Sequence, residues 1–189
     1  MASSDPRGST EEEPGIDPRL FRNVMGCFAT GVTVVSVALD GKVHCMTANA
    51  FMSGSLEPPL CVISVAKKAR LHDALARSRH FAVNILGEDQ EKYSRHFAGR
   101  PVEGLEPCFE YVDEVPLLVG RIAAVAARVE AVHPCGDHSL FVGRIFHMSA
   151  LEHGKPLVFY RGHYAALAHP ARLDHLQTPE FWWVGELAG

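Results

Sequence analysis

The stretch VTVVSVALDGK, residues 32–42, is the part of the sequence that says most about the fold. Residues 32–39 are mostly β-branched or apolar, which favours a buried β-strand. The dipeptide Asp40-Gly41 that follows is typical of a two-residue hairpin turn. We therefore expect a second, antiparallel strand to begin at Lys42.

Short strand candidates recur along the rest of the chain. They lie at residues 60–66, 80–86, 123–132, 139–149 and 157–160, and the last continues past Gly162 to Leu167. Only three short helices are predicted, at residues 18 to about 30, 67–78 and 88–97, and residues 99–116 are expected to form a loop. Strands and helices do not alternate as they would in a parallel sheet. The sequence therefore predicts a mainly β protein, an antiparallel barrel whose ends are covered by helices.

The composition is that of an ordinary globular domain. The 189 residues are 47% hydrophobic and 21% charged, with a net charge of −4, so one domain is expected. No basic excess favours nucleic acid, and no polybasic or long apolar segment favours a membrane, so we predict neither partner and a cytoplasmic location. The domain is expected to span residues 17–167, between a disordered acidic tail (1–16) and a C-terminal extension (168–189). Trp182 and Trp183 predict that this extension packs on the core or on a dimer partner.

The cysteines and histidines do not predict a metal site or a disulfide framework. There are five cysteines, an odd number, and no C-x-x-C pair, so free thiols are expected. His133, Cys135 and His138 match no common zinc spacing and lack a fourth ligand. We predict no bound metal.

A polar stretch, TANAFMSGSLEPPL at residues 47–60, separates two of the predicted strands. Thr47, Asn49, Ser53 and Ser55 would share one face of an extended backbone. Such a stretch offers hydroxyl and N–H groups to a polar ring or a phosphate. The same residues suit a polar edge strand that ends in a turn. From the residues alone, both interpretations stay open.

Two further short stretches carry groups suited to a ligand. KKAR, residues 67–70, places three cations near a helix start, which suits an anion, although a solvated basic turn is the commoner outcome. GDH, residues 136–138, places an aspartate beside a histidine that it can orient, and a polar turn is the alternative. No P-loop, dinucleotide fingerprint or nucleophile motif is present. The chemistry would therefore fall to a bound organic cofactor.

Taken together, these stretches resemble the short-chain flavin reductases, the reductase components of two-component flavin-dependent monooxygenases. FRNVMGCFATGVTVVS at residues 21–36 resembles the opening of that family, and residues 47–60 resemble its flavin loop. HFAVNIL, SRHFAG, the GDH turn and PLVFYRGHY then follow in the order of the family. The resemblance covers about residues 17–167. It implies an antiparallel, Greek-key split β-barrel that binds FMN and forms a homodimer.

The resemblance also implies a reaction and a set of site residues. Hydride would pass from nicotinamide C4 of NADH or NADPH to N5 of FMN or FAD, and the reduced flavin would go to a separate monooxygenase. His138 is implied near the nicotinamide, with Asp137 orienting the turn. The implied flavin contacts are Thr47, Ala48, Asn49 and Ala50 at the ring, Ser53 and Ser55 along the ribityl side, Lys67, Lys68 and Arg70 at the phosphate, and Tyr164.

The sequence departs from the family pattern at a few positions. Gly54 stands where valine is usual, and Cys45 stands where glycine is common. Ala69 and Arg70 stand where a hydroxyl residue is common, and Arg70 is expected to act as a charged donor instead. Three other functions stay open at this point. They are an oxidase similar to pyridoxamine-phosphate oxidase, a non-catalytic flavin carrier, and a small-ligand barrel that binds no flavin.

Overall fold

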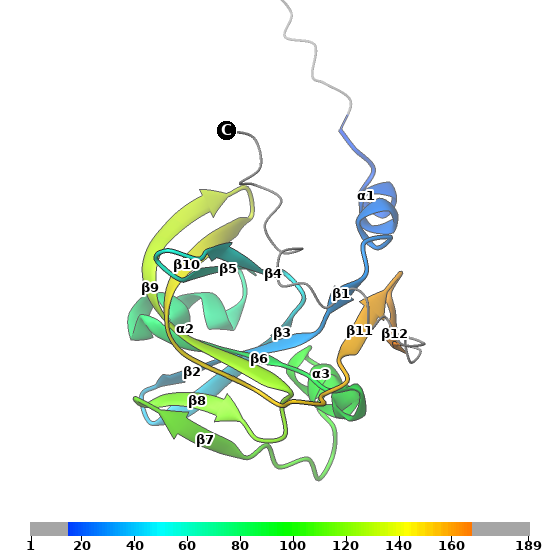
Figure 1. Cartoon of the computed structure of the whole chain (residues 1–189). Coiled ribbons are helices and arrows are strands. Elements are labelled where there is room, and N and C mark those ends of the chain that lie inside the picture. Colours follow the sequence, from blue (N-terminus) through cyan, green and yellow to red (C-terminus); the bar gives the residue numbers. More distant parts are fainter. Residues whose placement is uncertain (1–14, 168–189) are drawn as a thin grey trace, which may run out of the picture.

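The computed structural model describes residues 15–167. Seven strands form its main antiparallel sheet (Figure 1). They are β2 (Thr33–Leu39), β3 (Lys42–Ala48), β4 (Phe51–Ser55), β5 (Leu60–Ala66), β6 (His80–Ile85), β9 (Ala123–Cys135) and β10 (His138–Ala150), in the spatial order β3-β2-β6-β9-β10-β5-β4. The predictions for the extension, with Trp182 and Trp183, and for residues 1–14 of the tail lie outside the described residues.

The order of the strands explains why this sheet is curled. β3 and β4 are the two opposite edges of the sheet, yet only Asn49 and Ala50 join them. Such a link spans at most about 11 Å between the Cα atoms of Ala48 and Phe51. The sheet must therefore bend until its two edges meet at this corner. Because the edges are not paired with each other, the result is a barrel split along one side, as predicted.

Two smaller sheets pack against the barrel. β1 (Thr30–Gly31), β11 (Leu157–Tyr160) and β12 (His163–Ala166) form one, in the order β1-β11-β12, and β7 (Phe109–Val112) pairs with β8 (Val115–Leu118) in the other. Buried polar groups join β8 to the barrel. Asn84 Oδ1 accepts a hydrogen bond of 2.8 Å from Leu118 N–H, and Ser36 Oγ donates to the carbonyl of Pro116 at 2.5 Å. The hairpin is thus fixed to both β2 and β6.

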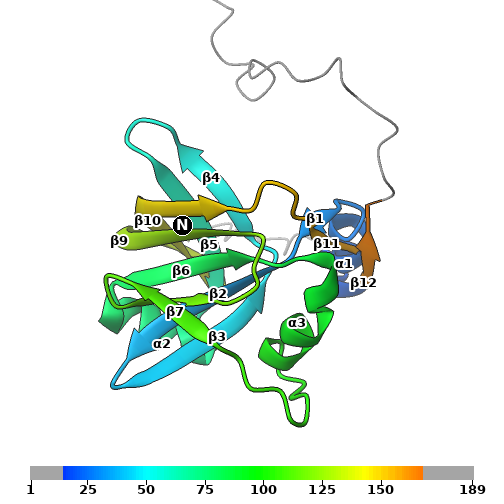
Figure 2. The same cartoon turned by 60° about the horizontal axis from the view of Figure 1, so that its bottom comes forward.

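Two of the helices contribute to the core (Figure 2). α2 (Arg70–Ser78) buries Leu71, Ala74 and Leu75 against the inner face of the barrel, where Phe81 and Phe141 are fully buried. α3 (Glu91–Phe97), preceded by the 3₁₀ turn Glu88–Gln90, packs beside a second cluster. β2 contributes to both clusters from its two faces. This double burial is why residues 32–39 read as a continuous apolar run instead of alternating.

The remaining helix, α1 (Pro18–Met25), stands away from the barrel (Figure 1). It begins as predicted, with Asp17 Oδ1 accepting a hydrogen bond from Arg19 N–H at 2.9 Å and Pro18 in the first turn. It ends at Met25, five residues before the predicted end. No residue of α1 is buried, and its apolar side chains, including Phe21 and Met25, are more than half exposed.

The sequence predicted most elements of the barrel correctly. The hairpin turn at Asp40-Gly41 is confirmed, with φ angles of 51° and 72°. The predicted helix at residues 67–78 begins only at Arg70, because Lys67–Ala69 form a turn closed by Ala69 N–H and the carbonyl of Ala66. The predicted strand past Gly162 is instead the hairpin β11–β12, which turns at Arg161-Gly162.

Two predicted loops contain strands. Residues 51–55 of the polar stretch form β4, which is paired with β5 at one edge of the sheet, so the edge-strand interpretation is correct for these residues. Residues 99–116 include β7 and the start of β8. The turn between these two strands uses Asp113 and Glu114, both with positive φ angles, 46° and 67°. Because glycine and asparagine are the usual residues in such a turn, the sequence carried little signal for this hairpin.

Candidate active site

The corner between β3 and β4 presents free backbone donors. Asn49 and Ala50 are both exposed, and their carbonyls accept hydrogen bonds from Phe51 N–H and Ser64 N–H at 3.0 and 3.1 Å. Within residues 15–167, neither Asn49 N–H nor Ala50 N–H has a backbone acceptor. Two adjacent N–H donors at an open corner fit a flat ring whose edge carries several acceptors, which is the chemistry of a flavin.

Thr47 anchors this corner to α3. Its Oγ1 donates a hydrogen bond of 2.7 Å to the carbonyl of Ser94, and Ser94 Oγ lies 2.8 Å from Tyr164 OH. Ala48 is bonded to β2, because Thr33 Oγ1 donates a hydrogen bond of 2.7 Å to its carbonyl. Thr47 and Tyr164, which the sequence predicted separately, are therefore connected through Ser94. Ser94 is fully buried. The sequence did not predict it as a site residue, and its position in the SRHFAG stretch was the one signal that could have indicated it.

Ser53 and Ser55 lie farther along β4. Ser53 is opposite Cys61 and Ser55 is opposite Leu60, so the register shifts at Gly54. The prediction that all four polar residues share one face is therefore wrong, because the corner and this irregularity break the alternation. Gly54 itself is closely packed. A Cβ there would lie 3.2 Å from Val62 Cγ2, so the usual valine would require Val62 to move.

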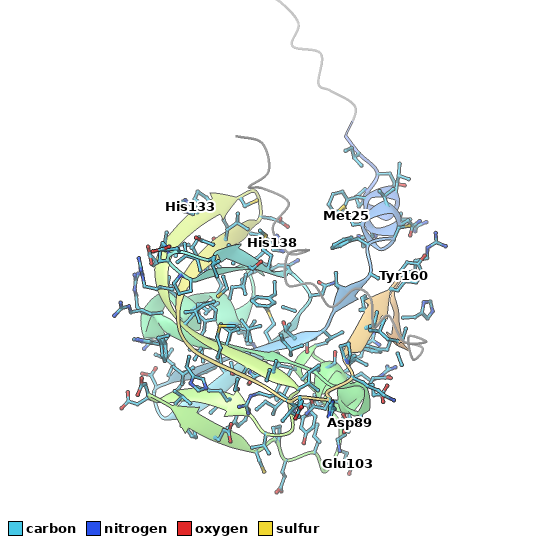
Figure 3. The ribbon with its side chains drawn as sticks, viewed as in Figure 1. Met25, Asp89, Glu103, His133, His138 and Tyr160 are labelled. Atoms are coloured by element: carbon cyan, nitrogen blue, oxygen red, sulfur yellow. The ribbon has the colours of Figure 1, made fainter. Side chains whose placement is uncertain are left out.

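The GDH turn joins β9 to β10, and Figure 3 shows His138 there, with His133 on the neighbouring strand. His138 Nδ1 donates a hydrogen bond of 2.7 Å to Asp137 Oδ1. This bond and the charge of the imidazole hold the pKa of Asp137 below its ordinary value, and the charge of Lys68 adds to the effect. The aspartate thus fixes which nitrogen of His138 faces outward, namely Nε2.

The cationic side chains that were predicted to contact the flavin phosphate lie beside the same turn. Lys67 Nζ donates to the carbonyl of Gly136 at 2.6 Å, and Lys67 N–H donates to the carbonyl of Asp137 at 3.0 Å. Lys67 therefore stabilises the turn through both its side chain and its backbone. Lys68 and Arg70 are exposed, and Arg70 is the first residue of α2. Of the three cations, these two keep their charged groups available to a ligand.

The corner and the GDH turn lie near the same end of β5. Ala50 is bonded to Ser64 on one side of this strand, and His138 is opposite Ala66 on the other side. Two strand spacings and two residues along the strand put them roughly 12 Å apart. The fold therefore gathers the predicted ring contacts and His138 at one end of the barrel, while Ser53 and Ser55 extend away from it.

A crevice of about 450 Å³ opens on the other side of Thr47, between α3 and the β11–β12 hairpin. Tyr164 forms part of its wall, and so do the side chains of Glu91, Arg95, Arg100, Phe159 and His163. Of these, only Tyr164 was predicted as a site residue. The charged residues of this wall lie on the outer side of α3 and in the loop after it. At such positions the sequence does not distinguish a binding site from an ordinary solvated surface.

The structure gives no geometry for a metal site. Across residues 15–167, no three His, Cys, Asp or Glu side chains lie together in a way that could hold a metal ion. None of the helices in this range is long and apolar enough to cross a membrane.

Comparison with known proteins identifies the family. Residues 25–168 match the model of the flavin reductase like domain. The chain belongs to this family. The match begins at the end of α1 and extends through β12, so it includes the corner, the GDH turn and the crevice.

The similar proteins are flavin reductases. An NADH-dependent flavin reductase from Rhodococcus is 41% identical over 160 residues, which cover 83% of this chain and 90% of that one. The reductase component of 4-hydroxyphenylacetate 3-monooxygenase from Thermus thermophilus is 40% identical over 80% of this chain and 97% of that one. The solved structure of flavin reductase PheA2 is 42% identical, with a TM-score of 0.78, over 81% of this chain and 99% of that one.

Proposed function

We propose that this protein is the reductase component of a two-component flavin-dependent monooxygenase, and that flavin binds at the corner between β3 and β4. As a member of the flavin reductase family, it oxidises NADH or NADPH and reduces FMN or FAD. The relatives' names support this activity over the oxidase and the flavin carrier. The observation that carries the site is the pair of free N–H donors at Asn49 and Ala50.

The corner performs the electrostatic part of the reaction. A bound flavin would supply the hydride acceptor. The N–H donors of Asn49 and Ala50 would stabilise negative charge on the acceptor atoms of such a ring without having to reorganise. Thr47 holds the end of β3, and with it the corner, in place through its hydrogen bond to the carbonyl of Ser94. No nucleophile is required, because positioning of the two rings is most of the task.

His138 and the cations next to it lie across β5 from the corner. There they contact the nicotinamide of the hydride donor and the phosphate of the flavin. With Nδ1–H committed to Asp137, a neutral His138 presents Nε2 as an acceptor, which suits the amide N–H of a nicotinamide. Lys68 and Arg70 provide charge for the flavin phosphate. The ribityl contacts implied for Ser53 and Ser55 are not part of this proposal, because the register shift at Gly54 turns their side chains to opposite faces of β4, and both lie away from the GDH turn. Lys67 acts indirectly, by holding the GDH turn.

The active form is a homodimer in which a second copy of the chain covers α1. Six large apolar side chains in and next to α1 are each more than half exposed. They are those of Ile16, Leu20, Phe21, Val24, Met25 and Phe28. An apolar surface of this kind on one short segment is typical of an association surface. In sedimentation velocity, we expect a dimer for the natural chain and a monomer for Phe21→Asp. A monomeric natural chain would refute this part of the proposal.

The activity is tested by the loss of absorbance at about 340 nm as reduced nicotinamide is consumed. NADH and NADPH are each mixed with the protein, with and without FMN or FAD. We expect rapid oxidation that depends on added flavin. Oxidation in none of the combinations would refute the reductase, and a bound flavin that NADH and NADPH do not bleach would indicate a carrier.

The role of His138 is tested against a matched control on the same hairpin. We expect His138→Ala to lower kcat/KM for the nicotinamide nucleotide up to about ten-fold, the effect of one lost hydrogen bond between neutral groups. His133→Ala, which removes an exposed histidine from β9, should leave kcat/KM unchanged. Equal effects in the two variants would exclude a specific role for His138.

A further inference from the structure

The end of β3 is held by the sheet on one side only. β3 is an edge strand that pairs with β2, and the last pair joins Ala48 to Thr33. Within residues 15–167, no strand pairs with its other side. There, the hydrogen bond of 2.7 Å from Thr47 Oγ1 to the carbonyl of Ser94 takes the place of a strand partner. Because the two residues of the corner follow directly, this bond fixes one end of the corner that carries the free N–H donors.

The place of Ser94 is set in turn by Tyr164. Ser94 lies in the middle of α3, a helix of seven residues, which is too short to be stable through its own hydrogen bonds. Its position therefore depends on tertiary contacts. Ser94 is fully buried, and its hydroxyl lies 2.8 Å from Tyr164 OH on β12. Because a buried hydroxyl that loses its partner costs free energy, this bond ties α3 to the β11–β12 hairpin.

The ring of Tyr164 is itself held in one orientation. Phe159 is its direct partner across the hairpin, and the two rings pack edge-on with centroids 5.4 Å apart. The guanidinium of Arg95 lies 5.2 Å from the centre of the Tyr164 ring. Aromatic and cation–π contacts of this kind fix the direction of a ring. The Tyr164 hydroxyl is thereby directed at the buried Ser94, which differs from the direct flavin contact that the resemblance implied.

We propose that Tyr164 is a positioning residue for the flavin, which acts through Ser94 and Thr47 and does not touch the flavin. This role rests on the proposed flavin site and deepens it, because it says what keeps the donors of the corner in place. Donors that are fixed in advance bind a ring without an ordering cost. A loosened corner should therefore bind flavin more weakly. The nicotinamide site should not change, because Lys67 holds the GDH turn separately.

The test measures the binding of FMN and of riboflavin to the full chain by quenching of flavin fluorescence, without a hydride donor. Tyr164→Phe removes the hydroxyl and keeps the ring between Phe159 and Arg95. Ser94→Ala removes the other half of the same hydrogen bond, from a residue too deeply buried to touch a ligand. We expect each variant to raise Kd about three- to ten-fold, as for the loss of one hydrogen bond. The double variant should bind no more weakly than the weaker single variant, because both remove one interaction.

Three further measurements separate positioning from a general loss of structure. Tyr160→Phe removes a hydroxyl from the other strand of the same hairpin and should leave Kd unchanged. Thr47→Val should weaken binding as Tyr164→Phe does, and Thr47→Ser, which keeps a hydroxyl for Ser94, should restore most of the affinity. In the reduction assay, KM for flavin should rise in Tyr164→Phe while KM for NADH stays the same, whereas a damaged fold would raise both.

Each outcome decides the inference. Similar rises in Kd for Tyr164→Phe and Ser94→Ala support it, provided that they are the same for FMN and for riboflavin, which lacks the phosphate. A rise in only one of these variants would overturn it, and a rise in Tyr164→Phe alone would make Tyr164 a direct flavin contact. Additive effects in the double variant, or a rise confined to FMN, would also overturn it. Natural affinity in both variants would refute the role of Tyr164 and leave the flavin site intact. If the natural chain binds neither flavin, the proposed flavin site fails as well.

Discussion

The barrel and α1 use similar apolar side chains in opposite ways. Phe81 on β6 is fully buried in a cluster to which α2, β2, β5, β9 and β10 also contribute. Phe21 on α1 is 54% exposed, and no residue of its helix is buried. The barrel therefore completes its core within one chain, whereas α1 does not. A helix as short as α1 gains little from its own hydrogen bonds, so its persistence depends on what covers it.

This difference separates two kinds of stability. Loss of a barrel side chain removes contacts that exist in every single chain, so its cost does not depend on protein concentration. Loss of an α1 side chain removes contacts that, in our proposal, form only between chains. Its cost then follows mass action and disappears on dilution. The predictions below test this distinction, in order of decreasing expected effect.

The largest effect is expected for truncation of a barrel phenylalanine. Phe81→Ala should lower the free energy of unfolding by about 3–5 kcal/mol, because the substitution leaves a cavity in a core that cannot close around it. Phe21→Ala should change the unfolding of the single chain by less than about 0.5 kcal/mol. Urea unfolding at several protein concentrations measures both. Equal losses in dilute protein would show that α1 packs on its own barrel.

A smaller effect is expected when a side chain is added instead. A Cβ at Gly143 would lie 2.6 Å from Phe81 Cζ and 2.9 Å from Ala127 Cβ. Gly143→Ala should therefore cost about 1–3 kcal/mol through overpacking. Gly31→Ala, next to the start of β2, meets nothing within 4 Å and should stay within about 0.5 kcal/mol. Thermal unfolding of the pair would contradict this account if Gly31→Ala were the more damaging.

The thiols report the same contrast without changing the fold. Burial raises the pKa of Cys45 to about 12 and that of Cys61 to about 11, so both stay protonated and unreactive at pH 8. Cys108 and Cys135 are exposed and should be alkylated by iodoacetamide before unfolding, as followed by mass spectrometry. Cys27, at the end of α1, should react more slowly in the dimer than in Phe21→Asp. Equal rates for Cys27 would place the partner elsewhere.

The smallest effect concerns the exposed GDH turn. The hydrogen bond from His138 lowers the pKa of Asp137 below the ordinary 3.8. The contribution to stability is therefore present above the ordinary aspartate pKa and is lost as the pH falls through the lowered one. Carboxyl NMR should show Asp137 titrating below 3.8, and nearer to it in His138→Gln. Because the pair is solvent-exposed, unfolding should barely change above pH 5. A normal titration of Asp137 would mean that the contact does not persist in solution.

The sequence by itself determined the strands that carry their own signals. Residues 32–42 predicted β2, its turn and the start of β3, because β-branched runs and Asp-Gly turns are local preferences. It also indicated the family, through short motifs in a fixed order. It predicted β4 and the β7–β8 hairpin poorly, since polar residues and a turn without glycine are compatible with several local structures.

Only the tertiary structure decided how the site is assembled. That Thr47 donates to Ser94, that Lys67 clamps the GDH turn, and that Arg100 joins a crevice next to Tyr164 all depend on contacts between residues far apart in the chain. The two-residue link between the opposite edges of the sheet forces the barrel to close at Asn49 and Ala50. This closure leaves their N–H groups without strand partners. Local preferences fix which residues are extended, but only the curled sheet, whose two edges meet at the corner without pairing, decides which backbone groups stay free for a ligand.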